Sequence, residues 1–146
     1  MNKTELEEIA DCAFRALDFA GSDPRNLPIP SQTIVLVYSS QGIIDNGGLE
    51  CFFSTDFPEH PPYTLFVNSY LRIGATQAAR CIEQAAAIFP FPEPHLHEQQ
   101  RQQFMASLSA DHPFARLSNR ICGDDSVWEL LCAYAIKHKE EIMGEM

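Results

Sequence analysis

Hydrophobic and polar positions follow the period of a helix over most of this chain. In residues 4–20 the apolar side chains of Leu6, Ile9, Ala13 and Leu17 are three or four residues apart and share one face. The same spacing recurs in the segments 75–89 and 126–142. Shorter helical patterns cover residues 33–44, 48–55, 63–73, 96–108 and 113–121. We therefore predict an all-α fold, a single compact helical domain of about seven helices that spans residues 1–146.

The segment 33–38 is the one place where the pattern also fits a strand. It reads Thr-Ile-Val-Leu-Val-Tyr and is rich in β-branched residues, which strands favour. The apolar run continues to Ile44, however, and its length favours a buried helix. We predict a helix here and expect any error in the fold class to begin at this segment.

The Asn46-Gly47-Gly48 sequence predicts a sharp corner between two helices. Glycine adopts positive φ without a steric penalty, so we expect one of the two glycines to have that conformation. Asp45 or Asn46 is placed to accept hydrogen bonds from the freed amides of the next helix. Phe52 and Phe53 would anchor that helix in the core. We predict that this motif is structural and not catalytic.

Negative charge is the most unusual bulk property of the chain. Twenty Asp and Glu residues oppose ten Lys and Arg residues, which gives a net charge of −10 at pH 7. Residues 1–60 contain ten of the acids and three of the bases. An acidic field repels phosphate backbones and attracts basic partners, so we predict no direct nucleic-acid binding. The alternative is that the charge serves only solubility.

The candidate binding face consists of carboxylates from the more acidic part of the chain. On the first helix these acids lie beside or opposite the apolar stripe, so they should be solvated and available to a partner. The predicted binding residues are Glu5, Glu8, Asp11, Asp18 and Asp23.

Motifs for catalysis or cofactor binding do not stand out. The five cysteines form no CxxC pair, and His95 with His97, the best metal candidate, lacks a second ligand pair. No nucleophile elbow or phosphate-binding glycine loop is present. We expect neither a metal nor an organic cofactor. We also expect no membrane association and a cytoplasmic location, because no apolar stretch approaches ~18 residues and the chain begins without a signal peptide's apolar segment.

The segment from Tyr38 to Phe53 resembles the signature of a bacterial family of unknown function. A tyrosine, a variable stretch and then Asn-Gly-Gly-x-x-x-Phe-Phe carry the resemblance. Ile73-Gly74-Ala75 follows at the distance seen in the family, and the similarity covers about residues 33–92. The chain departs from the pattern at Leu49 and Glu50, where the family commonly has an aromatic residue and Gln.

The resemblance implies an all-α domain and suggests a role for the charge. One member of the family is a DNA mimic, a dimer whose acidic surface occupies a transcription factor. The leading hypothesis is thus a non-enzymatic protein-binding module, in its sharpest form a homodimeric DNA mimic that sequesters a basic DNA-binding protein. A second hypothesis is an immunity or regulatory domain whose charge serves only solubility. An enzyme is the third.

Overall fold

The regular structure is entirely helical in the computed structural model, which describes residues 3–108 and 112–144. The α-helices are α1 (Lys3–Phe19), α2 (Ile29–Ser54), α3 (Tyr63–Arg72), α4 (Thr76–Ala86), α5 (Glu98–Ala106), α6 (Pro113–Ile121), α7 (Asp125–Lys137) and α8 (Lys139–Gly144). Two short 3₁₀ helices, η1 (Pro24–Asn26) and η2 (Pro94–Leu96), precede α2 and α5. The predicted all-α class is confirmed, and the segment 33–38 lies inside α2 as a helix.

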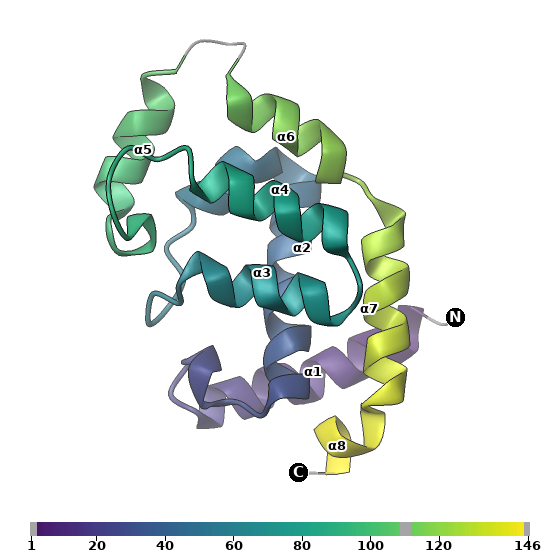
Figure 1. Cartoon of the computed structure of the whole chain (residues 1–146). Helices are drawn as coiled ribbons and strands as arrows, with labels where there is room; N and C mark the ends of the chain where they lie inside the picture. The colour runs from purple at the N-terminus through teal and green to yellow at the C-terminus, as the bar shows by residue number, and fades with distance from the viewer. Residues whose placement is uncertain (1–2, 109–111, 145–146) are drawn as a thin grey trace.

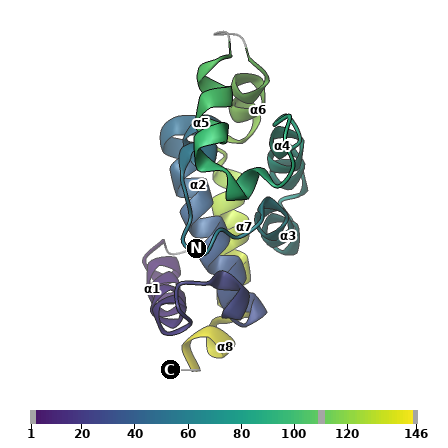
Figure 2. The same cartoon turned by 90° about the vertical axis from the view of Figure 1, so that its left-hand side faces the viewer.

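Helix α2 is the central element of the fold. Figure 1 shows that α1 crosses its first half, with α8 at the same end of the molecule, and that α4 and α6 lie near its second half. In the view of Figure 2, α2 and α7 run along the middle, with α1 on one side and α3 and α4 on the other. Buried side chains occur all around the first half of α2, where Ile34, Val35, Leu36 and Val37 are in the core. A helix that is apolar on every face is the kind that neighbouring helices enclose.

The predicted helix over 126–142 divides into α7 and α8 at His138. The chain turns there, and α8 packs against the outside of α1 with Ile142 buried. The turn stabilises the fold by burying the apolar side chain of Ile142. A straight continuation of α7 would carry α8 away from α1 and leave that side chain exposed. None of the described helices is both long and apolar enough to cross a membrane.

Candidate functional site

The corner after Asn46 is a local break in α2 at Gly48. This residue has φ 74° and ψ −173°, a conformation almost restricted to glycine. The break removes the amide of Leu49 from the helical ladder, and this N–H donates to Ser118 Oγ at 2.8 Å. A Cβ on Gly48 would lie only 3.0 Å from the same Ser118 Oγ. Glycine is therefore needed both for its backbone conformation and for the close approach of α6, and the predicted positive φ is confirmed.

The two aromatic residues of the motif are fully buried, as predicted. Phe52 and Phe53 contact each other edge to face, with ring centroids 5.0 Å apart. The two departures from the family pattern also lie at this junction, since Leu49 is buried and Glu50 accepts a hydrogen bond from the Ser118 hydroxyl at 2.9 Å. This part of the motif joins α2 to α6.

The prediction that Asp45 or Asn46 caps the helix after the corner is wrong. The break at Gly48 aims the Leu49 amide toward α6, so Ser118 accepts its hydrogen bond instead. Asn46 is exposed. Asp45 has another role, since its carboxylate accepts hydrogen bonds from the start of α7.

Asp45 fixes the position of α7 against α2. Its Oδ2 accepts a hydrogen bond from Trp128 Nε1 at 2.7 Å, and its Oδ1 accepts one from the Gly123 amide at 2.7 Å. The Gln41 amide donates to the same Oδ1 at 2.8 Å. Gln41 in turn accepts from the hydroxyl of Tyr70, whose pKa is raised by complete burial. A chain of hydrogen-bonded polar groups, buried at Tyr70 and Gln41 and half-buried at Asp45 and Trp128, thus connects α3, α2 and α7.

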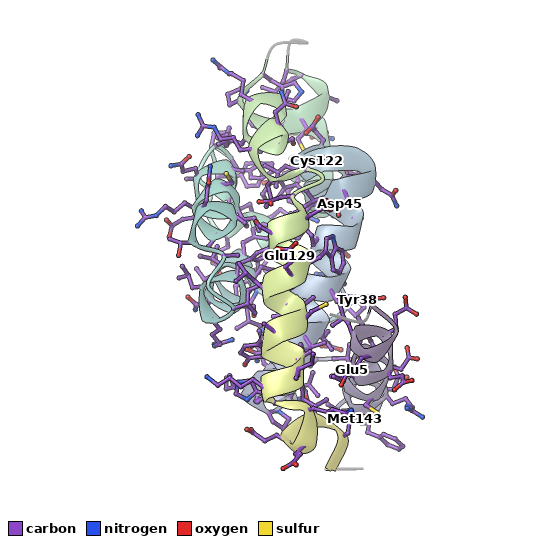
Figure 3. The ribbon with its side chains drawn as sticks, turned by 90° about the vertical axis from the view of Figure 1, so that its right-hand side faces the viewer. Glu5, Tyr38, Asp45, Cys122, Glu129 and Met143 are labelled. Carbon is purple, nitrogen blue, oxygen red and sulfur yellow. The ribbon has the colours of Figure 1, made fainter. Side chains whose placement is uncertain are left out.

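A groove of about 1070 Å³ lies between α1, α2 and α7. Figure 3 looks onto α7 and shows Tyr38, Asp45 and Glu129 along this side of the molecule. The lining residues combine carboxylates, aromatic rings and small or apolar groups: Leu6, Glu7, Tyr38, Gly42, Asp45, Asp125, Trp128, Glu129 and Cys132. No lysine or arginine is among these residues, so the groove has a strongly negative lining.

Two aromatic rings form an apolar corner in this groove. Tyr38 and Trp128 have ring centroids 5.5 Å apart and an interplanar angle of 86°, and Phe14 supports Tyr38 at 6.0 Å. Burial raises the pKa of Tyr38, and the nearby carboxylates of Glu7 and Asp11 raise it further. A tyrosine phenol is neutral at pH 7, and these neighbours favour its neutral form further.

The predicted acidic residues fall into two groups. Glu8, Asp11 and Asp18 are exposed, and none forms an ion pair with another described residue. Glu5 and Asp23 are used within the chain. The Lys139 ammonium lies 3.1 Å from Glu5 Oε1, at the contact between α8 and α1.

Asp23 caps the 3₁₀ helix η1. Its carboxylate accepts hydrogen bonds from the backbone amide and from the side chain of Arg25, each at 3.0 Å. The bond from the Arg25 side chain is the main reason that the pKa of Asp23 is lowered. This carboxylate therefore has a local structural role.

Sequence reasoning missed the carboxylates that line the groove. Glu7, Asp125 and Glu129 are exposed side chains from α1 and α7. Glu7 and Asp11 are four residues apart and therefore lie on one face of α1. This spacing was the signal in the sequence that could have added Glu7 to the predicted acidic face. Which flank of α1 borders the groove depends on where α7 packs, and periodicity does not encode that.

Positive charge gathers on other helices. Figure 3 shows α3 and α4 on one side of α7 and α1 on the other. Helices α3, α4 and α6 contain four arginines and a single carboxylate, Glu83; the arginines are Arg72, Arg80, Arg116 and Arg120. The charge is thus unevenly distributed, with the α1, α2 and α7 side acidic.

The histidines of the candidate metal motif pack against aromatic rings. His95 lies edge-on to Tyr63 at 6.2 Å, and His97 lies edge-on to Phe91 at 6.1 Å. Partial burial lowers the pKa of His95. Within the described parts of the chain, no three His, Cys, Asp or Glu side chains gather as metal ligands would.

The fold and the groove together define an all-helical protein with an acidic, aromatic-lined face. A family model described as DMP19-like protein matches residues 25–138, and the chain belongs to this family. The matched range contains the segment 33–92 and extends beyond it on both sides, whereas α1 lies outside it. No curated protein and no solved structure matches the chain.

Proposed function

We propose that this protein is a non-enzymatic module that binds a basic protein through the face formed by α1, α2 and α7. In its specific form, the proposal is that this face imitates DNA and sequesters a basic DNA-binding protein. The observation that carries the proposal is the separation of charge. Exposed carboxylates without an ion-pair partner in the described chain gather around the groove, whereas the arginines of α3, α4 and α6 lie elsewhere.

The spacing of carboxylates on α1 suits an extended cationic surface. Glu7, Asp11 and Asp18 follow one another at four and seven residues, so they share one face of the helix. At 1.5 Å per residue they stand ~6 Å and ~10 Å apart along the axis. This row of carboxylates attracts the lysines and arginines of a DNA-binding groove and accelerates association, and Arg15, exposed beside Asp11 and Asp18, offsets part of its negative charge.

Family membership supports the scaffold of the proposed mimic. The match includes α2 and α7, which form two walls of the groove, and the resemblance noted above includes a DNA-mimic member. Helix α1 is outside the matched range, so the family match does not cover its carboxylates. The homodimer implied by the resemblance stays a prediction, which sedimentation velocity at several protein concentrations tests.

A domain whose charge serves only solubility is the competing function. Other exposed carboxylates, such as Glu59 and Glu98, lie away from the groove, and Glu5 and Asp23 are engaged within the chain. The solubility of such a domain would depend on its net charge and not on where each charged residue lies. The two functions therefore differ in their response to charge reversal at matched positions.

The test is affinity capture from the native cell extract at low and at high salt. We expect a basic DNA-binding protein to be captured at low salt and displaced by duplex DNA. The variants Glu8→Lys and Asp11→Lys should reduce capture, whereas the matched reversal Glu83→Lys on α4 should not. Capture of only neutral or acidic proteins, unaffected by reversal at Glu8 and Asp11, would contradict the proposal.

A further inference from the structure

We propose that the groove between α1, α2 and α7 is a guanidinium site, which receives an arginine-bearing segment of the basic partner. This inference rests on the proposed function for the existence of that partner, and it adds the location and the chemistry of recognition. It starts from the combination of flat aromatic rings and unpaired carboxylates in one groove, without a lysine or arginine in the lining.

Arginine is the cation that matches both features of the groove. Its guanidinium group is planar, stacks on aromatic faces and donates two parallel hydrogen bonds to a carboxylate. Trp128 and Tyr38 provide the rings, while Glu7, Asp125 and Glu129 provide the carboxylates. Lysine carries a compact, strongly hydrated charge that gains less from a flat ring.

Asp45 holds the tryptophan ring of the site in place. The Trp128 Nε1–H donates to Asp45 Oδ2 at 2.7 Å, and Tyr38 contacts the same ring edge to face. Because Asp45 also accepts bonds from Gln41 and Gly123, it is a positioning residue for the ring. Glu7, Asp125 and Glu129 are exposed and form no ion pair with a described residue, so they are available to an incoming cation.

The size of the groove indicates a segment of polypeptide as its occupant. A volume of about 1070 Å³ is slightly above the ~300–1,000 Å³ that small-molecule sites span, and one arginine side chain would fill only part of it. Gly42 contributes to this space, because it lies in the wall and has no side chain. The remaining space accommodates the residues that flank the arginine.

Trp128 provides a direct reporter for the test, because it is the only tryptophan in the chain. The probe is a short peptide of alternating arginine and glycine, titrated into the intact protein at low salt while tryptophan fluorescence is recorded. We expect a saturable change. The same peptide with lysine in place of arginine should bind about threefold to tenfold more weakly, as expected from the loss of stacking on the ring.

Substitutions of exposed residues locate the binding without disturbing the fold. Glu129→Gln and Glu7→Gln should each weaken arginine-peptide binding severalfold, and the matched variant Glu83→Gln on α4 should leave it unchanged. Equal binding of the lysine peptide would overturn the assignment to guanidinium. A fluorescence change that depends on protein concentration alone would show that a second copy of the chain covers the groove, and would also overturn it.

Failure of this inference is distinguishable from failure of the proposed function. If the arginine peptide does not alter Trp128 fluorescence but a basic protein is still captured in a manner that depends on Glu8 and Asp11, the groove is not the arginine site and the wider proposal stands. If the arginine peptide does not alter Trp128 fluorescence and no basic protein is captured, the guanidinium site and the proposed function are both wrong.

Discussion

The end of α2 and the groove differ in how their charged side chains are placed, because the charge is buried in the first region and exposed in the second. Arg101 of α5 is 1% exposed, and its guanidinium donates to the carbonyl oxygens of Phe53, Thr55 and Pro94 at 2.8, 3.2 and 2.7 Å. Two of these carbonyls lie at the C-terminal end of α2, where the helix dipole favours a cation. The carboxylates of Glu7 and Glu129 in the groove are exposed and have no ion-pair partner in the described chain.

The buried charge of Arg101 stabilises the fold, whereas the exposed carboxylates of the groove are available to a partner. A buried charge persists only when its hydrogen bonds are satisfied, and Arg101 meets that condition by closing the end of α2. Exposed carboxylates gathered on one face repel each other slightly and contribute little to stability. Substitutions in the first region should therefore change the free energy of unfolding, and those in the second should change binding.

The largest loss of stability is expected at Arg101. Arg101→Met leaves three carbonyl groups without their donor, and we expect the free energy of unfolding to fall by about 3–5 kcal/mol. Urea denaturation followed by circular dichroism measures it. The control is Arg116→Met on the exposed surface of α6, which should change stability by less than about 0.5 kcal/mol. Equal effects of the two variants would show that Arg101 is not the structural charge described here.

The second loss is expected at Gly48, where an added side chain would meet both backbone strain and a close contact. Gly48 and Gly123 both have positive φ, 74° and 72°, but only Gly48 faces a side chain that an added Cβ would meet at 3.0 Å. We expect Gly48→Ala to cost about 2–3 kcal/mol and Gly123→Ala about 1 kcal/mol. Thermal denaturation of both variants gives the comparison. A cost at Gly48 no greater than at Gly123 would mean that the contact with Ser118 does not matter.

Alkaline pH should destabilise the buried aromatic core through ionisation of Tyr63. Burial raises the pKa of Tyr63 to about 12, from about 10 in the unfolded chain. Because the folded pKa is the higher one, this contribution to stability is complete below pH 10 and is lost between pH 10 and 12. Absorbance of tyrosinate measured against pH should show delayed ionisation that coincides with unfolding. Ionisation of all four tyrosines near pH 10 in folded protein would contradict this.

The smallest effect on stability is expected for the groove carboxylates. Glu7→Gln and Glu129→Gln should each change the free energy of unfolding by no more than about 0.5 kcal/mol, because both side chains are exposed. The same denaturation experiment measures this. Should either variant lose more than about 1 kcal/mol, the carboxylate has a structural role and the contrast with Arg101 fails.

Sequence reasoning predicted the features that depend on local patterns. The helices follow from the spacing of apolar residues, and the positive φ of Gly48 follows from the chemistry of glycine. The burial of Phe52 and Phe53 follows from their place in the next turn. Even the ambiguous segment 33–38 was resolved by the length of its apolar run.

The features that depend on distant residues were not predictable in the same way. The partners of Asp45 are Gly123 and Trp128, far along the chain, so its role in positioning α7 has no local signature. Arg101 lies in a polar, glutamine-rich segment, a pattern that suggests exposure, yet it is buried beneath the end of α2. Glu5 is paired and Glu7 faces the groove because α7 and α8 pack where they do.

The most direct test of the central claim is competition with DNA. A fluorescently labelled duplex is bound to the purified DNA-binding protein obtained by capture, and the present protein is added while the anisotropy of the duplex is recorded. We predict that the anisotropy falls to the value of free duplex, and that Glu8→Lys requires a higher concentration than wild type or Glu83→Lys. An anisotropy that rises, or that stays constant at saturating protein, would show that the acidic face and DNA do not compete for one surface.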